Sequence, residues 1–151
     1  MPVVKVTDPV LREYCIAALN YYHPHGGRTT GYGSKFHSLY IWMEEPNIVA
    51  SILLLTTNLK TVFNKARKSY PELAGLKYRE TLFIKRILNI PPHNKLLELL
   101  LGVEPLLREQ GVKALFSYVY PGLPGKIYQL AKYKFGWTRG GYQFVYKRIE
   151  G

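Results

Sequence analysis

The chain has 151 residues, of which 47% are hydrophobic and 21% are charged. This composition excludes a disordered or fibrous protein, and the length predicts a single domain over residues 1–151. Lys and Arg outnumber the acidic residues 21 to 10, which gives a net charge of +11. Such an excess favours a polyanionic partner, and DNA is the leading candidate. Asp8 is the only Asp among the acids, so a carboxylate-rich metal site is not predicted.

The single cysteine, Cys15, excludes an internal disulfide and a cysteine-rich zinc site. Its apolar neighbours predict a buried thiol. No apolar run reaches the roughly 18 residues that cross a bilayer, so we expect no membrane partner. Proline and charged residues interrupt the first ten positions, so no export signal is predicted and the cytoplasm is the expected location.

The first predicted helix follows Asp8, because Asp before Pro9 is a favourable helix start, and apolar residues recur at helical spacing to about Asn20. Two strands flanking 44–47 form a predicted hairpin. In chain order the predicted elements are a strand at 3–6, a helix at 9–20, strands at 36–43 and 48–56, a helix at 59–68 capped by Thr57 or Asn58, a strand at 77–90, a helix at 94–110 that Gly102 and Pro105 bend or divide, a strand at 114–120, a helix at 127–134 and a strand at 142–149. This order predicts an α/β fold with a mixed, partly antiparallel sheet flanked by helices.

A loop at 21–35 is rich in glycine and carries aromatic, His and Arg side chains. Tyr22, His23 and Arg28 are candidate nucleic-acid contacts that would stack a displaced base or hold its phosphate. His23 and His25 are weak candidate metal ligands, and solvent-facing or hydrogen-bonded histidines are the favoured interpretation. Whether a metal binds stays open.

The predicted helix at 59–68 has a basic face, with Lys60, Arg67 and Lys68 at spacings of seven and one. This face is a second candidate nucleic-acid surface. A solvated basic face without a partner explains the same pattern equally well.

Most of the chain, from the predicted antiparallel pair onward, resembles the GNAT acyltransferase superfamily. The strand LFIKRILNI, a long helix, a strand ending in SYVYP and the segment IYQLAKYKFGW follow one another in the GNAT order. The most specific piece is Ile127–Gln129 followed, after five residues, by Phe135–Trp137. GNAT proteins carry a tyrosine in the helix after the fifth strand. The resemblance implies a cleft between two splayed parallel strands that takes acetyl-CoA or a related acyl-CoA.

A narrower resemblance is to the Mom family of phage-type proteins, which modify adenine in DNA by methylcarbamoylation. Phe116–Pro121 and Gly125–Ala131 resemble the family segment SYADP…GTIYQA. Leu82–Pro92 resembles its LxRLxVxP strand, and Asn20–Arg28 resembles its HHYSGR-like loop. This likeness implies transfer of an acyl-derived group to N6 of adenine.

The resemblance implies that Tyr128 is a general acid that protonates a leaving thiolate. Glu80, at the start of a strand, is the best-placed carboxylate for a general base, although an exposed structural Glu is the commoner situation. Ser117 and Tyr118 lie at the end of the expected fifth strand, where open α/β sheets bind ligands.

The predicted cofactor residues are Ile90, His93, Asn94 and Lys95, within the segment NIPPHNK. GNAT proteins hold the cofactor's pyrophosphate here on a glycine-containing loop. This chain has no glycine in the segment, and Pro91 and Pro92 supply no backbone donor. Tyr120 also stands where the Mom-like segment has Asp. Acyl-CoA therefore remains a conditional prediction.

The sequence thus predicts a GNAT-like transferase acting on adenine in DNA. A GNAT acetyltransferase for a small or protein amine and an inactive GNAT-fold module that binds nucleic acid are the alternatives. The transferred group, the sequence context and the oligomeric state are left open.

Overall fold

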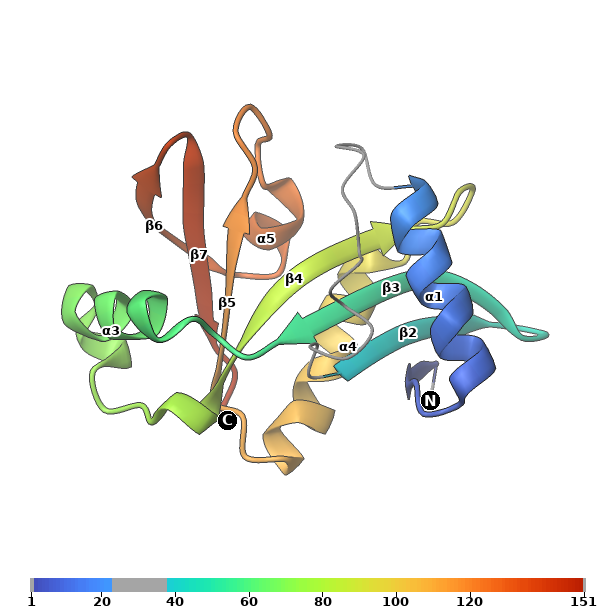
Figure 1. Ribbon diagram of the computed structural model, residues 1–151, viewed down its shortest axis with the longest axis horizontal. Helices are drawn as coiled ribbons and strands as arrows, with labels where there is room; N and C mark the ends of the chain where they lie inside the picture. The colour runs from blue at the N-terminus through green and yellow to red at the C-terminus, as the bar shows by residue number, and fades with distance from the viewer. Residues whose placement is uncertain (1, 23–37, 151) are drawn as a thin grey trace. The chain divides into compact units, whose positions relative to one another are not determined.

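The computed structural model describes residues 2–22 and 38–150 (Figure 1). Over these residues the fold is mixed α/β, with seven strands in the order β1-β2-β3-β4-β5-β7-β6. The elements are β1 Val3–Lys5, α1 Pro9–Tyr22, β2 Ser38–Glu44, β3 Ile48–Thr56, α3 Lys60–Ser69, the short 3₁₀ helices η1 Pro71–Leu73 and η2 Tyr78–Glu80, β4 Thr81–Asn89, α4 Leu96–Glu109, β5 Ala114–Val119, α5 Lys126–Leu130, β6 Lys134–Arg139 and β7 Tyr142–Arg148.

The described residues form two compact units, each treated by itself below. The first unit contains the described parts of Met1–Thr56 and Lys85–Val103. The second contains Thr57–Ile84 and the described part of Glu104–Gly151.

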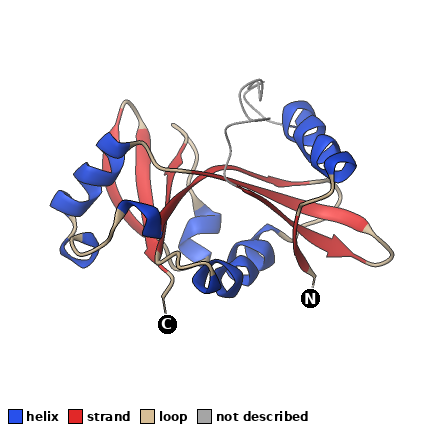
Figure 2. Cartoon of the chain, turned by 60° about the horizontal axis from the view of Figure 1, so that its bottom comes forward, coloured by secondary structure: helices blue, strands red, loops and turns tan. Residues whose placement is uncertain are grey.

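In the first unit, β2 pairs antiparallel with both β1 and β3. Figure 2 shows α1 on one face of these strands and the start of α4 on the other. Alternate strand residues pack against α1, and the core they form includes Cys15, Leu19, Leu39, Ile41, Ile52 and Leu54. The predicted helix start is confirmed, because Asp8 Oδ2 accepts a hydrogen bond from the Leu11 N–H at 2.9 Å.

The predicted helix at 94–110 is observed as one continuous helix, α4, which runs through both Gly102 and Pro105, so neither residue divides it. A side chain at Gly102 would place its Cβ 2.7 Å from Val3 Cγ2, so glycine allows strand and helix to approach closely. Pro105 has no backbone N–H, so it cannot donate the helical hydrogen bond to the carbonyl of Leu101. The residue Leu101 is 40% exposed.

In the second unit, β4 and β5 are parallel, as the GNAT resemblance implied. Their register runs from Thr81 opposite Ala114 to Phe83 opposite Phe116, although both strands continue beyond it. Strand β7 pairs antiparallel with β5 and with β6. The predicted mixed sheet is thereby confirmed, whereas the acyl-CoA cleft stays a prediction.

The sequence prediction missed β6 and made α5 too long, because residues 130–134 continue a helical pattern while the chain leaves the helix after Leu130. It also placed the cap of α3 wrongly. Leu59 occupies the N-cap and offers no side-chain hydrogen bond, whereas Asn58 Nδ2 instead donates to Thr81 Oγ1 at 2.8 Å. The strand predicted from residue 77 begins at Thr81, after η2.

The described residues also bear on three features that the sequence analysis considered, namely the cysteine, membrane-spanning helices and metal-binding clusters. Cys15 is fully buried, and burial raises the pKa of its thiol to about 11, as expected for an unreactive cysteine. Within 2–22 and 38–150, no helix is long and apolar enough to cross a membrane. The same residues contain no cluster of three His, Cys, Asp or Glu side chains that could hold a metal ion.

Candidate functional site

Tyr128 lies in the second unit, on α5, and its side chain is buried. Its hydroxyl lies 3.1 Å from Ser117 Oγ on β5. Ser117 donates its hydrogen to the carbonyl oxygen of Ile84 on β4, at 2.9 Å. A serine hydroxyl has one hydrogen, so Tyr128 is the donor in the bond to Ser117. The backbone pairing of β4 with β5 ends at Phe83 and Phe116. Just beyond it, the side chain of Ser117 still joins the two strands by its hydrogen bond to Ile84, and Tyr128 binds to Ser117.

Burial raises the pKa of Tyr128 to about 12. The phenol is therefore neutral and carries its proton at physiological pH. A buried hydroxyl that keeps its proton can act as a hydrogen-bond or proton donor.

The turn before α5 requires Gly125. This residue is the N-cap and has φ +65°, in the left-handed region. A Cβ here would lie 2.9 Å from Val119 Cγ2 and 3.1 Å from Phe135 Cε2. Glycine at 125 thus lets α5 begin close to β5 and β6, which positions Tyr128 beside Ser117.

Tyr133 is a second buried tyrosine in contact with Tyr128. The ring centroids are 5.1 Å apart in an edge-to-face arrangement. Tyr133 Oη is buried and has no hydrogen-bond partner among the described residues. Burial, with smaller contributions from Tyr128 and Glu104, raises the pKa of Tyr133 well above its usual value.

Glu80 ends η2, directly before β4, and both of its carboxylate oxygens have partners. Oε1 accepts the Lys77 N–H at 2.8 Å, and Oε2 lies 2.9 Å from Lys113 Nζ. These contacts, led by the Lys77 hydrogen bond, lower the pKa of Glu80. Ser117 lies four residues beyond Lys113, about 13 Å along an extended strand. The geometry supports a capping role for Glu80, and its role as a general base stays a prediction.

Ser117 and Tyr118 are neighbours in sequence but lie on opposite faces of β5, since strand side chains alternate. Tyr118 packs with Phe83, Trp137, Tyr142 and Phe144. Its hydroxyl accepts a hydrogen bond from Trp137 Nε1 at 3.2 Å. The structure therefore brings Ser117 to Tyr128 and places Tyr118 in a separate aromatic cluster.

The predicted cofactor residues lie in the first unit, before α4. Ile90 is buried, and its carbonyl accepts the His93 N–H at 2.9 Å. Asn89 Oδ1 accepts the Lys95 N–H at 3.0 Å, while Asn89 Nδ2 donates to Asn94 Oδ1 at 3.2 Å. Lys95 Nζ lies 3.8 Å from carboxylate oxygens of both Glu44 and Glu98. Thus the lysine charge at this helix start is already partly neutralised.

The start of α4 nevertheless leaves three backbone donors. The N–H groups of Leu96, Leu97 and Glu98 form no hydrogen bond within the described part of the chain. N–H groups at the start of a 14-residue helix point outward along its axis and favour an anion. The residues present therefore fit a pyrophosphate without the usual glycine.

The predicted nucleic-acid residues are distributed over both units. Tyr22 ends α1 and is 40% exposed, whereas His23, His25 and Arg28 lie outside the described residues. Lys60 and Lys68 are exposed on α3, and the Lys60 ammonium lies 5.7 Å from the Tyr78 ring centroid. Arg67 Nε and Nη2 both donate to the carbonyl of Ala74, so this side chain fastens α3 to the following turn.

The sequence did not reveal the role of Trp137. Strand β6 contains a bulge, because Phe135 pairs with Val145 while Thr138 pairs with Gln143. One extra residue reverses the alternation of side chains, so Trp137 leaves the face of Phe135 and stacks on Phe144 with centroids 4.0 Å apart. The segment Phe135–Gly136–Trp137 was the only sequence signal for this residue. Regular alternation along β6 would place Trp137 on the same face as Phe135, which is the wrong face.

Gly136 makes this bulge compatible with Tyr70. Tyr70 Oη accepts the Trp137 N–H at 2.7 Å, and a Cβ at Gly136 would lie 2.0 Å from that same oxygen. We expect Gly136→Ala to expel the hydroxyl and lower stability by about 1–3 kcal/mol. Urea unfolding measures the change. Gly75→Ala is the control, since a Cβ there meets nothing within 4 Å, and equal stability of the two variants would contradict this account.

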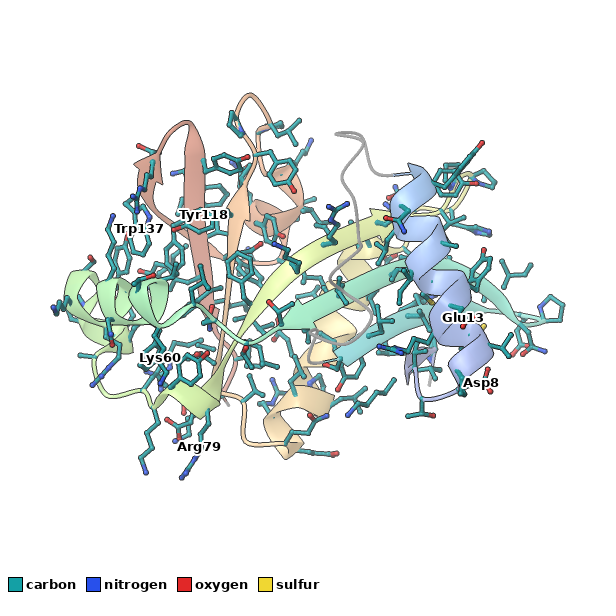
Figure 3. All side chains as sticks on the ribbon, viewed as in Figure 1. Asp8, Glu13, Lys60, Arg79, Tyr118 and Trp137 are labelled. Atoms are coloured by element: carbon teal, nitrogen blue, oxygen red, sulfur yellow. The ribbon has the colours of Figure 1, made fainter. Side chains whose placement is uncertain are left out.

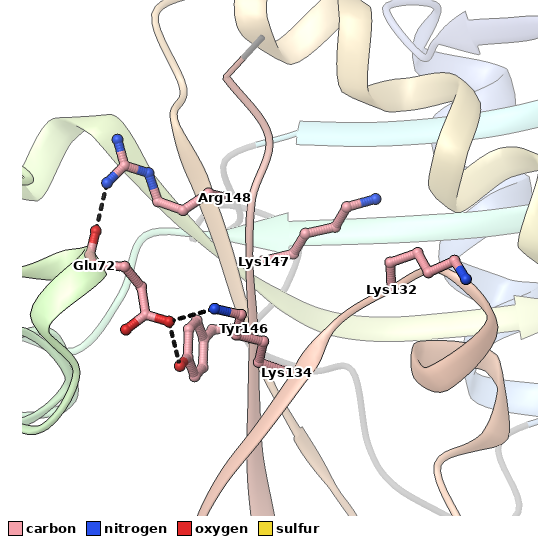
Figure 4. A pocket seen from close by; sticks show the side chains of 6 residues that line it. All are labelled: Glu72, Lys132, Lys134, Tyr146, Lys147 and Arg148. Atoms are coloured by element: carbon pink, nitrogen blue, oxygen red, sulfur yellow. Dashed lines mark hydrogen bonds and ion pairs between the residues drawn. The ribbon is translucent and has the colours of Figure 1, made fainter.

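A pocket of about 190 Å³ in the second unit is lined by Glu72, Lys132, Lys134, Tyr146, Lys147 and Arg148 (Figure 4). Glu72 Oε2 accepts from Lys134 Nζ at 2.7 Å and from the Tyr146 hydroxyl at 3.0 Å. Arg148 donates to the Glu72 carbonyl and pairs with Glu150, and Lys147 pairs with Glu104. Apart from Lys132, the side chains that line the pocket are held in ion pairs and hydrogen bonds, and those of Glu72, Lys134, Tyr146 and Arg148 connect η1 to β6 and β7.

A scan of protein-family models finds no match to this chain, and a search of curated proteins also finds none. Solved structures do match. Aminoglycoside 6′-acetyltransferase type Ii is 11% identical with a TM-score of 0.65, covering 100% of this chain and 99% of that one. A Bacillus subtilis acetyltransferase in complex with CoA is 10% identical with a TM-score of 0.62, covering 97% of each chain.

A GNAT-family acetyltransferase from Listeria monocytogenes is 13% identical, with a TM-score of 0.52. The match covers 73% of this chain, which spans 63% of the length of the Listeria protein. At such low identity the likeness concerns the fold. This chain has the fold of the GNAT acetyltransferases.

Proposed function

We propose that this chain is an acyl-CoA-dependent N-acyltransferase whose acceptor is N6 of adenine in DNA. One observation supports the transferase assignment most directly, namely the hydrogen-bonded series Tyr128–Ser117–Ile84 within a GNAT fold. It lies where the backbone pairing between β4 and β5 ends.

In this proposal the Tyr128 hydroxyl holds the proton that the leaving thiolate takes up. Its pKa of about 12 keeps the proton on Oη at neutral pH. Ser117 positions the hydroxyl through one hydrogen bond and is itself fixed by the Ile84 carbonyl. The acceptor amine forms the new C–N bond, the C–S bond breaks, and the amine proton passes to water or a base.

The start of α4 would hold the pyrophosphate of acyl-CoA through the N–H groups of Leu96, Leu97 and Glu98. When bound, the cofactor supplies an activated acyl thioester. Lys95 adds a positive charge, although Glu44 and Glu98 compete for it. We therefore expect weaker acyl-CoA binding than a glycine-containing loop would give.

The DNA acceptor is supported by the net charge of +11 and by the resemblance of residues 116–131 to the Mom-like segment. A second candidate is an acetyltransferase for a small amine. The likeness to an aminoglycoside acetyltransferase over nearly the full length of both chains favours it. Substitution of the motif Asp by Tyr120 supports the inactive nucleic-acid-binding module as a third candidate.

Mass spectrometry of nucleosides from cells that express the chain tests the proposal. We expect a modified deoxyadenosine in cells with the unmutated protein and little in cells with Tyr128→Phe. Purified protein incubated with acetyl-CoA and a panel of small amines separates the second candidate. Acylated amines without modified adenine would show that the acceptor is a small amine and not DNA. No acyl transfer in either assay would favour the inactive nucleic-acid-binding module.

A further inference from the structure

Six aromatic side chains form a ladder on one face of β5 and β7 in the second unit. Phe116 and Tyr118 alternate along β5, Tyr120 follows directly after that strand, and β7 contributes Tyr142, Phe144 and Tyr146. Phe116 is opposite Tyr146 and Tyr118 is opposite Phe144, while the Tyr120 and Tyr142 rings contact each other at 5.5 Å.

The two ends of this ladder differ in burial. At one end Phe116 and Tyr146 pack under α3, with Phe63, Ala66 and Leu73. At the other end Tyr118 and Tyr120 are half-buried and Tyr142 is 41% exposed. Tyr118 also packs against the core cluster, so the exposed end offers partly exposed aromatic surface, most of it on Tyr142.

Trp137 joins the exposed end through the bulge in β6. Its ring lies parallel to Phe144, at 3° between planes, and its indole N–H is held by Tyr118. Figure 3 shows Trp137 and Tyr118 close together beside α3, on the opposite side of this helix from Lys60 and Arg79. We call Tyr118, Trp137 and Tyr142 the aromatic platform.

Cations accompany the aromatic platform. The Lys65 ammonium lies 4.4 Å from the Trp137 ring centroid, and Arg139 is paired across from Tyr142. Both basic residues are exposed, and neither forms an ion pair with a described residue. Of the five acidic residues in the second unit, Glu72, Glu80, Glu104 and Glu150 each have a basic partner already, and Glu109 forms no ion pair with a described residue. The platform therefore combines stacking surface with unneutralised positive charge.

We propose that the aromatic platform stacks an unpaired base of the DNA acceptor, with Lys65 and Arg139 binding the adjoining phosphates. Aromatic rings beside cations are what a single-stranded nucleic acid requires, because every base has a π-face and every nucleotide has a phosphate. The inference rests on the proposed DNA acceptor. Arg67 already donates two hydrogen bonds to the Ala74 carbonyl. We therefore expect Lys65 and the aromatic platform, and not Arg67, to contact the DNA.

Tryptophan fluorescence tests this assignment. The chain has two tryptophans, so Trp42→Phe leaves Trp137 as the only reporter. We expect a single-stranded oligonucleotide to quench Trp137, and an abasic oligonucleotide of equal length and charge to quench it far less. Equal quenching by both strands, or by poly-glutamate, would overturn base stacking.

Binding of a fluorescein-labelled oligonucleotide, followed by anisotropy, tests the residues without replacing Trp42. Tyr142→Ala is expected to weaken binding about 5- to 150-fold, which is the usual contribution of one stacked base. Tyr14→Ala removes a comparably exposed tyrosine from α1 and should leave binding unchanged. Lys65→Ala should lower the slope of log affinity against log salt by about 0.7, whereas Arg67→Ala should not. If Tyr142→Ala binds as tightly as Tyr14→Ala, the platform is not the binding surface.

The nucleoside assay keeps this inference separate from the proposed function. Base-dependent quenching without modified adenine would retain the platform and remove the transferase activity on DNA. Modified adenine with full activity in Tyr142→Ala would retain the proposed function and remove the platform.

Discussion

Tyr128→Phe is expected to reduce acyl transfer about 10²–10⁴-fold, the usual contribution of a positioned proton donor. The substitution removes one hydroxyl from a buried ring and leaves the apolar packing in place. It removes only one hydrogen bond, the one between Tyr128 and Ser117, because Ser117 keeps its own bond to Ile84. The loss of stability should therefore be about 1 kcal/mol. Turnover per folded molecule and the melting temperature, measured together, give both values.

Tyr133→Phe is the matched control, since Tyr133 is equally buried and contacts Tyr128. Its hydroxyl has no hydrogen-bond partner within the described residues, so its removal should cost neither stability nor activity. Full activity of Tyr128→Phe with a lowered melting temperature would make Tyr128 a packing residue.

The pKa of about 12 adds a pH expectation. The donating form of Tyr128 is the protonated one, and a raised pKa extends that form to higher pH. Between about pH 6 and 9, a rate-limiting ionisation should therefore come from another group. A loss of activity near pH 9 that disappears in Tyr128→Phe would contradict this assignment.

The fold was predictable where side-chain periodicity was regular. The strand at 48–56 and the helix beginning at Pro9 were predicted at their observed starts, because an apolar run and an Asp-Pro cap are local signals. Strand β6 was not predictable from alternation, since its bulge at Gly136–Trp137 breaks the period of two. That bulge depends on Tyr70, which is far away in the sequence.

The site was predictable only in part. The sequence identified Tyr128 and Ser117 separately, through a motif, but their mutual contact depends on where α5 packs. Ser117 and Tyr118 were treated as one group, whereas neighbouring strand residues point to opposite faces. Glu80 could not be assigned from the sequence, because its contacts with Lys77 and Lys113 arise from the 3₁₀ turn and from the start of β5.

Lys147→Met is expected to lower the free energy of unfolding by about 3–5 kcal/mol, more than the same change at the exposed Lys134. Lys147 Nζ lies 2.6 Å from Glu104 Oε2, and the two side chains are only 16% and 11% exposed. Methionine matches the length of the lysine but leaves the Glu104 carboxylate without its main partner. Arg108 remains 3.9 Å from Glu104 and compensates weakly. Chemical denaturation followed by circular dichroism measures the change.

Lys134→Met provides the comparison, because Lys134 pairs with Glu72 at 2.7 Å yet is 66% exposed. An exposed pair should contribute about 0–1 kcal/mol. Lys147→Met combined with Glu104→Gln should recover part of the loss, since no unpaired charge then remains buried. The Lys147 ammonium also lies 5.9 Å from the Tyr133 ring centroid, and Tyr133 packs on Tyr128. Equal losses in the two single variants would show that burial of the Lys147–Glu104 pair adds nothing to its effect on stability.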